Sequence, residues 1–301
     1  EISESFKQEN YGIQSYAFLK YIQENLPGRI AGTEKEKEMA SFISAILLNG
    51  GYSEKDIKLN SFDIEEGVPM MDTSGENIFD GGEDSQSSQN IEVIKEGQSK
   101  KTIIVGAHYD SAGTHGVDDN GSGVAVALES ALRMIDVETP YTIKYVFFGA
   151  EEKGLLGSRA YVKAHESELS HHLFNMNIDL AGQSLGGTVI GVTGDSSICH
   201  QFEALAEKCG IGMTTRSSVW SSDSNTFAWK RVPSMTLNRD GYGMHTEYDT
   251  IDLISAWSLR RSALLLCTIA NYLANEEVFP LCRQIPQEFL AQLDASFSTE
   301  K

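Results

Sequence analysis

The sequence predicts an α/β protein, a three-layer α/β/α sandwich around a mixed, mostly parallel sheet. From residue 91 onward, short apolar stretches rich in Ile, Val and Phe alternate with amphipathic stretches of helical spacing. The apolar stretches are continuous, which is typical of strands that are covered on both faces. No internal repeat and no Pro/Ser-rich linker divides the chain, so we expect a single domain over residues 1–301.

Two helices and one strand are predicted before residue 90. In the second helix, residues 33–49, Thr33 is followed three residues later by Glu36, which is the spacing of a capping box. Residues 64–90 contain no basic residue and many Gly, Ser and Asp, so we expect a long acidic surface loop there. The other predicted elements of this part are a helix over 13–25 and a strand over 57–64.

The remainder of the chain is predicted to build most of the sheet. Continuous apolar runs predict strands, and apolar residues at helical spacing predict helices. The predicted strands cover residues 90–96, 100–108, 142–150, 173–180, 188–194, 213–219 and 233–238. The predicted helices cover residues 123–135, 155–165, 196–209, 225–231 and 252–275, followed by a C-terminal helix and tail over 278–301.

The composition excludes several classes of protein. The net charge is −19, and a nucleic-acid-binding protein would instead carry a basic face. No apolar stretch approaches the roughly 20 residues of a membrane-spanning helix, so we expect no membrane insertion. The four cysteines, which form no metal-binding CxxC pair, are compatible with two disulfides or with free thiols; they are Cys199, Cys209, Cys267 and Cys282.

Polar side chains follow the apolar runs at the points where the predicted strands end. In a parallel sheet the carboxyl ends of the strands share one edge, so we expect these side chains to converge there. They are His108, Asp110, Asp118, Asp119, Glu151, Glu152, Asp179 and His245. Two histidines with three or four carboxylates suit zinc and, less tightly, manganese or cobalt. One of the carboxylates can bridge two metals about 3.5–4 Å apart.

Local spacing supports a metal site. His108 and Asp110 are two residues apart on a strand end, so both side chains leave the strand on the same side. Asp110 can then accept the second ring N–H of His108 and fix the tautomer of the ligand. Because Glu151 and Glu152 are adjacent, one can bind a metal while the other acts as a general base.

At these residues the chain resembles the secreted co-catalytic di-zinc aminopeptidases, the leucyl aminopeptidase type related to aminopeptidase Y. The resemblance covers roughly residues 10–275, and its motifs occur in the order of the family. The matching stretches are RIAGTEKEKEMASFI, VGAHYDS, GVDDNGSGVA, FFGAEEKGLLGS, NIDLAG, SDSNTF and HTEYDTID. It implies a zinc-exopeptidase-like fold and two Zn²⁺ ions per chain.

The resemblance also implies a role for each residue of the site. One zinc would be bound by His108 and Asp179, the other by Glu152 and His245. Asp118 would bridge the two metals, and the Asp118–Asp119 peptide corresponds to one that is cis in the superfamily. Glu151 would be the general base and acid, and Asp110 would orient His108.

The implied activity is removal of N-terminal residues from peptides with a free N-terminus, by a monomer outside the cell or in the cell envelope. Three alternatives stay open: a glutaminyl cyclase, a non-catalytic binding module like the transferrin receptor domain, and a glutamate-type carboxypeptidase. The carboxypeptidase would need cations for the substrate carboxylate, and the segment 212–245 offers Arg216, Lys230, Arg231 and Arg239.

One departure from the family lies at Ser224, where many relatives have histidine after Ser222-Asp223. This departure concerns local substrate contacts, because the position is not among the matched metal ligands. Several large apolar residues lie near this position in the sequence and could form either an apolar specificity pocket or ordinary core packing. They are Trp220, Phe227, Tyr242 and Met244. His115, inside the first motif, has no predicted role.

Overall fold

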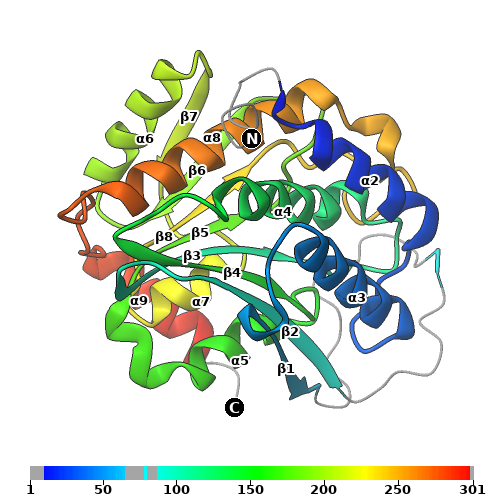
Figure 1. Ribbon diagram of the computed structural model, residues 1–301, viewed down its shortest axis with the longest axis horizontal. Coiled ribbons are helices and arrows are strands. Elements are labelled where there is room, and N and C mark those ends of the chain that lie inside the picture. Colours follow the sequence, from blue (N-terminus) through cyan, green and yellow to red (C-terminus); the bar gives the residue numbers. More distant parts are fainter. Residues whose placement is uncertain (1–9, 65–77, 80–86, 299–301) are drawn as a thin grey trace.

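The computed structural model describes residues 10–64, 78–79 and 87–298. One eight-stranded sheet has helices on both faces, which confirms the predicted three-layer α/β/α arrangement (Figure 1). The strand order is β1-β2-β4-β3-β5-β8-β6-β7. The strands are β1 (Ile57–Asp63), β2 (Ser87–Lys95), β3 (Ser99–His108), β4 (Tyr141–Phe148), β5 (His172–Ile178), β6 (Thr188–Thr193), β7 (Met213–Ser217) and β8 (Ser234–Asn238).

The centre of the sheet is parallel and its flanks are mixed. Strand β3 pairs in parallel with β4 and β5, and β5 pairs in parallel with β8. Strands β1 and β2 add to β4 as an antiparallel edge, while β6 runs antiparallel to β8. Because β4, β3, β5 and β8 run in one direction, their carboxyl ends meet at one edge of the sheet, where the predicted site residues follow them.

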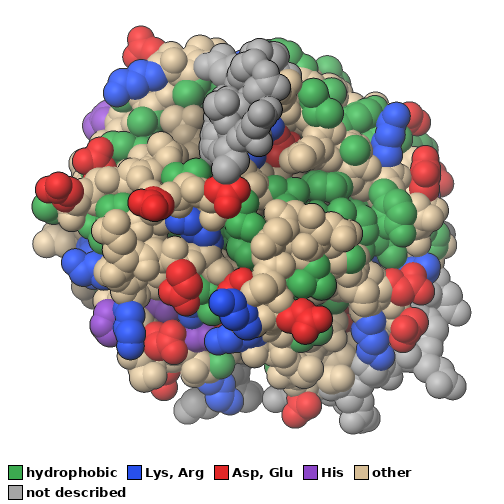
Figure 2. All heavy atoms as spheres, viewed as in Figure 1, with side chains coloured by type: hydrophobic (Ala, Val, Ile, Leu, Met, Phe, Trp, Pro, Cys, Tyr) green, Lys and Arg blue, Asp and Glu red, His purple; other side chains and the backbone are tan. Residues whose placement is uncertain are grey.

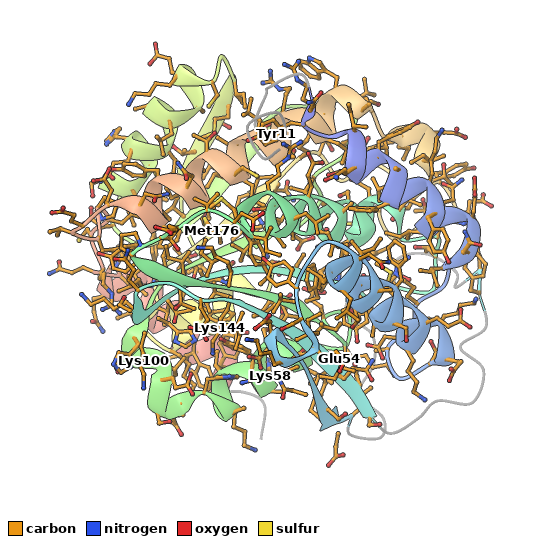
Figure 3. All side chains as sticks on the ribbon, in the orientation of Figure 1. Tyr11, Glu54, Lys58, Lys100, Lys144 and Met176 are labelled. Carbon is orange, nitrogen blue, oxygen red and sulfur yellow. The ribbon has the colours of Figure 1, made fainter. Side chains whose placement is uncertain are left out.

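Five helices cover one face of the sheet. They are α2 (Ile13–Asn25), α3 (Glu34–Asn49), α4 (Gly123–Met134), α6 (Ser197–Lys208) and α8 (Ala256–Asn275). Helix α4 is buried along nearly its whole length because it lies between the sheet and the outer helices α2 and α8. Met176 of β5, labelled in Figure 3, belongs to the main core beneath these helices.

Three helices cover the opposite face: α5 (Leu156–Ala164), α7 (Ser224–Trp229) and α9 (Gln287–Ser298). A smaller core packs Phe148 of β4 against Tyr161 and Phe227, with ring centroids about 6 Å apart. Burial of these large side chains, each worth a few kcal/mol, fixes the end of β4 immediately before the Glu151-Glu152 pair.

Three of the helix starts that differ from the predicted ones have a clear physical reason. Thr33 caps α3 by accepting the backbone N–H of Glu36, but the Glu36 carboxylate accepts the Gly32 N–H rather than completing a capping box. Helix α8 begins after Ser255, whose side chain accepts the Ser258 N–H. The last helix begins only at Gln287, because Pro286 cannot occupy a helix interior.

Most of the predicted acidic loop, residues 64–90, lies outside the described residues. At its end, strand β2 extends the sheet from Ser87 onward, earlier than the predicted start at residue 90. Ile78 and Phe79, which are described, both donate backbone hydrogen bonds to the Gly113 carbonyl. Phe79 also meets the His115 ring edge-on, with centroids 5.1 Å apart, so His115 has a packing contact in the loop after β3.

The structure shows how the charged side chains are distributed and which state the cysteines adopt. Acidic and basic side chains are interspersed over the face seen in Figure 2. All four cysteines are free thiols in the structure, which resolves the alternative left open by the sequence. Within the described ranges, no helix combines the length and the apolar character that a membrane span requires.

Candidate metal centre at the carboxyl edge of the sheet

Three neighbouring parallel strands each deliver a ligand type at their carboxyl ends. His108 is the last residue of β3 and pairs in register with Phe148, the last residue of β4. Glu151 and Glu152 follow β4 after two residues, and Asp179 follows β5 directly. The structure therefore brings together the strand-end residues that the sequence pattern predicted would converge.

A carboxylate between two histidines forms the middle of the site. Asp119 Oδ1 lies 3.2 Å from His108 Nε2, and Asp119 Oδ2 lies 3.0 Å from His245 Nε2. Asp119 belongs to the buried turn Val117–Ser122, and its dihedral angles there are not helical. Each oxygen of this one carboxylate thus faces a different imidazole, which is the arrangement of a bridging ligand.

The carboxylate in the middle of the site is not the predicted Asp118. Asp118 Oδ1 accepts the backbone N–H of Gly182 at 3.0 Å, so its side chain points away from the histidines. The cis peptide likewise lies one residue later than expected, between Asp119 and Asn120. The structure therefore places Asp119, and not the predicted Asp118, between the two histidines, because the turn directs the two adjacent carboxylates to opposite sides.

The remaining carboxylates approach from both sides. Glu152 Oε2 lies 3.2 Å from His245 Nε2, and Asp179 Oδ1 lies 3.6 Å from His108 Nε2. Glu151 Oε2 lies 4.0 Å from the same His108 nitrogen. Two groups of ligand atoms, each within 4.8 Å of one another, are close enough to hold an ion: His108 with Glu151 and Asp179, and His108 with Asp119 and Glu152.

Two buried aspartates hold the loops that carry these ligands. Asp110 accepts the backbone N–H groups of Glu151 at 3.0 Å and Glu152 at 3.1 Å, and its Oδ1 lies 3.4 Å from His108 Nδ1. Asp249 accepts those of Asp118 at 2.7 Å and Asp119 at 3.1 Å. Asp110 was predicted as an orienting residue. Asp249 was not, although it lies within the matched stretch HTEYDTID.

Asp179 is held by polar side chains from three segments. Ser222 Oγ donates to Asp179 Oδ2 at 2.6 Å, and Asn177 Nδ2 donates to Ser222 Oγ at 2.7 Å. Asn238 Nδ2 donates to the Asp179 carbonyl at 2.8 Å. The segment Ser222-Asp223-Ser224, which departs from the family at its third residue, therefore fixes Asp179 through its first residue.

A buried arginine shapes the loop after β3. The Arg29 guanidinium donates to the carbonyls of Tyr109 at 2.7 Å and Gly116 at 2.7 Å, and also to that of His115 at 3.1 Å. Burial lowers the pKa of Arg29 to about 10, which still leaves it charged at neutral pH. Arg29 belongs to the matched RIAGT stretch, and its contacts explain how that stretch supports the site from outside it.

The carboxylates of the site give it an excess of negative charge. Hydrogen bonds to Asp119 and Glu152 raise the pKa of His245 to about 11. Burial raises the pKa of Glu152 to about 7 and holds the pKa of Glu151 well above its usual range, against the opposing effect of His108. Carboxylates that are buried this close together need a compensating cation.

The donor set fits divalent metal ions. Imidazole and carboxylate donors suit zinc and related transition metals. Among the described residues, Glu152 Oε1 is buried and accepts no hydrogen bond, so it keeps a lone pair for a ligand. The residues around the cleft include no lysine or arginine in the part of the chain that the structure describes. The site thus offers both the charge and the free lone pairs that metal ions require.

An open cleft of about 290 Å³ leads to these residues. Trp220, Met244 and Leu180 are the large apolar residues that line it. Trp220 and Met244 were both considered for an apolar specificity pocket on the basis of the sequence. Phe227 is instead buried in the small core, and Tyr242 is not among the lining residues and is 66% exposed. Two of the four residues considered for a specificity pocket therefore reach the cleft.

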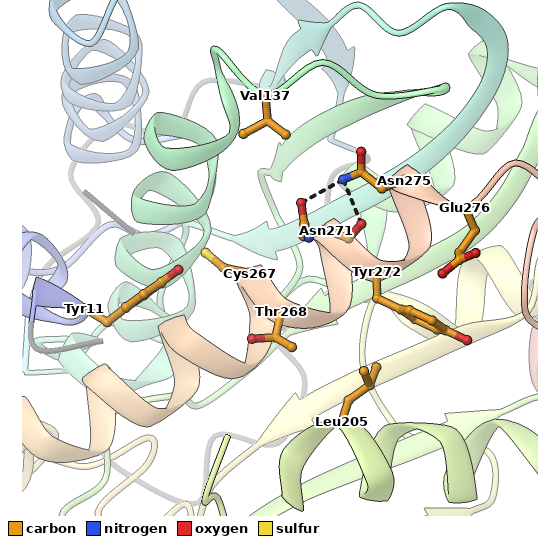
Figure 4. Close-up of a pocket in the computed structure, with 9 residues that line it drawn as sticks. All are labelled: Tyr11, Val137, Leu205, Cys267, Thr268, Asn271, Tyr272, Asn275 and Glu276. Atoms are coloured by element: carbon orange, nitrogen blue, oxygen red, sulfur yellow. Dashed lines mark hydrogen bonds between the residues drawn. The ribbon is translucent and has the colours of Figure 1, made fainter. Parts of the chain in front are cut away.

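A second cavity, of about 550 Å³, lies along helix α8 away from the histidines (Figure 4). Its described lining includes one carboxylate, Glu276, and one thiol, Cys267, but no histidine. Burial raises the pKa of Cys267 to about 12, so this thiol is not a nucleophile at neutral pH. Asn271 and Asn275 are hydrogen-bonded to each other at the rim. This cavity lacks the groups for catalysis.

The family resemblance is supported by comparison with known proteins. Residues 90–270 match the sequence model of Peptidase family M28. Aminopeptidase YwaD of Bacillus subtilis is 35% identical over 216 residues, which are 65% of this chain and 47% of that protein. The chain therefore spans about half the length of this relative.

The fold is shared with solved structures of low sequence identity. A zinc aminopeptidase from Bacillus subtilis superposes with a TM-score of 0.76 at 20% identity, over 93% of this chain and 98% of that one. A glutaminyl cyclase from an Acidobacteriales bacterium gives a TM-score of 0.74 at 18% identity, over 87% and 94% of the two chains. At such identities the likeness establishes the α/β architecture.

Proposed function

The chain belongs to peptidase family M28, and we propose that it is an aminopeptidase that holds two zinc ions at the carboxyl edge of its sheet. The observation that carries the proposal is Asp119, whose two carboxylate oxygens face His108 and His245 at 3.2 and 3.0 Å. A carboxylate shared between two imidazoles is the arrangement expected for two neighbouring metal ions. The aminopeptidase names of the relatives support the reaction class.

The proximity of the side chains supports a ligand assignment. We assign His108 and Asp179 to one zinc, His245 and Glu152 to the other, and Asp119 to both. Asp110 and Asp249 position these ligands through the backbone of the loops that carry them. A mixed nitrogen and oxygen shell of this kind suits zinc.

Glu151 is the proposed general base, because it lies in the cleft 4.0 Å from His108 Nε2, farther than Asp179 at 3.6 Å, and the assignment above does not use it as a ligand. It would take a proton from the attacking water as the water oxygen bonds to the scissile carbonyl carbon. The same carboxyl group would give that proton to the leaving nitrogen as the C–N bond breaks. Zinc, when bound, supplies Lewis-acid polarisation of the carbonyl and eases ionisation of water.

Charge in the cleft favours a free α-amino group over a carboxylate as the recognised end of the substrate. Carboxylates line the cleft, whereas three of the four cations considered for a carboxypeptidase are engaged elsewhere, and the fourth, Arg216, is not among the residues that line the cleft. Arg239 is buried and donates to the Gln183 carbonyl at 2.9 Å, and Arg231 pairs with Asp294 at 3.3 Å. Lys230 lies over the Trp229 ring. An exopeptidase for peptides with a free N-terminus follows.

The location outside the cell and the monomeric state stay predictions. One relative from Mycobacterium tuberculosis, a probable lipoprotein aminopeptidase that is 34% identical over 165 residues, supports the first of them. Fractionation of the native host and light scattering of the purified chain would test the two predictions separately.

The proposal is tested by parallel measurements of activity and metal content. We expect the chain to hydrolyse leucine p-nitroanilide, to lose that activity on chelation and to regain it with zinc. An N-acetylated peptide should not be cleaved, and equal cleavage of the blocked peptide would exclude an exopeptidase. Two zinc ions per chain are expected by mass spectrometry.

Glu151→Gln separates the base from the ligands. It should lower kcat by about 10²–10⁴-fold, the usual contribution of a general base, with two metals still bound. Glu166→Gln is the matched control, because Glu166 is an exposed carboxylate outside the cleft. Full activity in Glu151→Gln would assign the base elsewhere, and loss of metal would make Glu151 a ligand.

A further inference from the structure

A second cluster of titratable side chains lies at the opposite, amino edge of the sheet. It lines a cavity of about 410 Å³ that is bounded by the starts of β3, β4 and β5 and by the turn Glu166–His171. Thr102 of β3, which lines it, lies six residues before His108, so the cavity is about 20 Å from the metal centre along the strand. Its basic lining residues are Lys58, Lys100, Lys144, His165, His171 and His172.

The lysines come from three strands and gather on one face. Figure 3 labels Lys58 of β1, Lys100 of β3 and Lys144 of β4 in this region. Figure 2 shows basic and histidine side chains grouped on the lower left of the same face. Among the residues that line the cavity, three lysines face two carboxylates, Glu96 and Glu168, which leaves a surplus of one positive charge, while Glu92 beside the lining pairs with His165. That surplus is local, because the whole chain carries −19.

The buried part of the cluster is internally satisfied. Lys144 Nζ lies 3.3 Å from Glu168 Oε2, and His165 Nε2 lies 3.3 Å from Glu92 Oε2. Burial lowers the pKa of His172 to about 4, so its ring is neutral at pH 7. Its Nδ1 must then donate to the Glu168 carbonyl, and its Nε2 accepts the Tyr161 hydroxyl at 2.9 Å. These groups form a fixed floor.

The exposed part of the cluster is available to a ligand. Lys58 and Lys100 are exposed and form no ion pair within the described residues. A lysine ammonium binds oxyanions as a point charge, and Ile94 adds an apolar contact to the same cavity.

From these observations we propose that the amino-edge cavity binds a small organic molecule that carries two or more anionic oxygen groups, held by Lys58 and Lys100 over the floor formed by Lys144 and His172. A volume near 400 Å³ is in the range of small-molecule sites and exceeds what a single inorganic ion needs. Separation of about 20 Å from the catalytic edge makes this a site distinct from the substrate cleft.

The test uses naphthalene trisulfonate, a fluorescent trianion of suitable size that coordinates zinc only weakly. Titration of the metal-loaded chain should show saturable binding of one probe per chain, weakened by added salt. Naphthalene monosulfonate should bind about tenfold more weakly, because it meets only one of the charges. Equal affinity for the two probes would mean that the ring, and not the charge, is recognised, and would overturn the proposal.

Variants assign the binding to this cavity. Lys58→Ala combined with Lys100→Ala should weaken trisulfonate binding about tenfold or more. Lys208→Ala, an exposed lysine at the end of α6 outside the cavity, should leave the affinity within about twofold. Unchanged binding in the double variant would place the probe elsewhere, the zinc site included. An equal loss of affinity in Lys208→Ala would mean that the probe responds to the net charge of the chain and not to these two lysines. Either result overturns the proposal.

Discussion

Both edges of the sheet hold histidines and carboxylates, but among the described lining residues only the amino edge adds lysines. At the carboxyl edge, His108 and His245 face the carboxylates of Asp119, Glu152 and Asp179. At the amino edge, His165 and His172 lie with Lys144 and with glutamates that already have cationic partners. Both edges pair histidine with a carboxylate, so the presence of such pairs alone does not mark a metal site.

Charge balance separates the two edges. Carboxylates raise the pKa of His245 to about 11, whereas burial without a facing carboxylate lowers the pKa of His172 to about 4. The carboxyl edge has more carboxylates than cationic side chains and therefore suits metal cations. The amino edge has a lysine that pairs with one of its carboxylates, and two further lysines, Lys58 and Lys100, that form no ion pair among the described residues. A histidine is suited to bind a metal where the carboxylates around it lack a cationic partner. It is suited to a structural role where those carboxylates are already paired.

The largest expected effect tests whether Asp119 carries the carboxyl edge. Asp119→Ala removes the only carboxylate placed between the two histidines of the described site, and should weaken zinc binding by more than about a hundredfold, beyond the loss seen for outer hydrogen-bonding partners. Isothermal titration of the metal-free protein with zinc measures this loss directly. The stoichiometry should fall below two ions per chain.

Asp118→Asn is the matched control for Asp119→Ala. It changes the adjacent carboxylate, which faces the Gly182 N–H instead of the histidines, and an asparagine oxygen can still accept that bond. Both zinc ions should remain. A larger loss of zinc in Asp118→Asn than in Asp119→Ala would restore Asp118 as the bridge and break the assignment.

An intermediate effect is expected at Asp249, which holds the backbone of Asp118 and Asp119 without reaching the cleft. Asp249→Asn replaces one accepting oxygen by a donor that faces an N–H group. Zinc affinity should fall about ten- to a hundredfold, the usual cost of losing an outer partner. Titration with zinc and the thermal midpoint are measured together; a lower midpoint with unchanged zinc affinity would limit Asp249 to a structural role.

Much of the carboxyl edge was predictable because its signals are local. Apolar runs mark β3, β4 and β5, and His108, Glu151 and Asp179 each come within a few positions of a run's end, so topology alone brings these three residues together. The choice between Asp118 and Asp119 was not predictable. It depends on the non-helical dihedral angles of Asp119, and two adjacent residues of one type carry no signal of the side to which each points.

The amino edge carries no such local signal. Lys58, Lys100 and Lys144 are separated by more than forty residues each and lie in strands of ordinary composition. Only the strand order β1-β2-β4-β3 brings their strands together. Asp249 escaped prediction for a related reason, because its partners are backbone N–H groups about 130 residues away.

The smallest expected effect tests the amino edge through the stability of the fold. His172 has a folded pKa of about 4 against an ordinary value of 6.5, so the unfolded chain takes up its proton first as the pH falls. The neutral ring therefore contributes stability above pH 6.5, and this contribution declines between pH 6.5 and 4. Between pH 6.5 and 5 the loss should be about 1.5 kcal/mol.

His172→Gln isolates that contribution, because glutamine keeps a donor and an acceptor for the Glu168 carbonyl and the Tyr161 hydroxyl but does not titrate. Urea unfolding at pH 6.5 and pH 5 should show a smaller fall in the free energy of unfolding for the variant than for the wild type. His165→Gln is the opposing control. Glu92 raises the pKa of His165 against the effect of burial, so its contribution is present below pH 6.5 and is lost as the pH rises. An equal pH dependence in His172→Gln and wild type would show that the ring has the same pKa in the folded and the unfolded chain, and would contradict the neutral ring assigned to the floor of the amino-edge cavity.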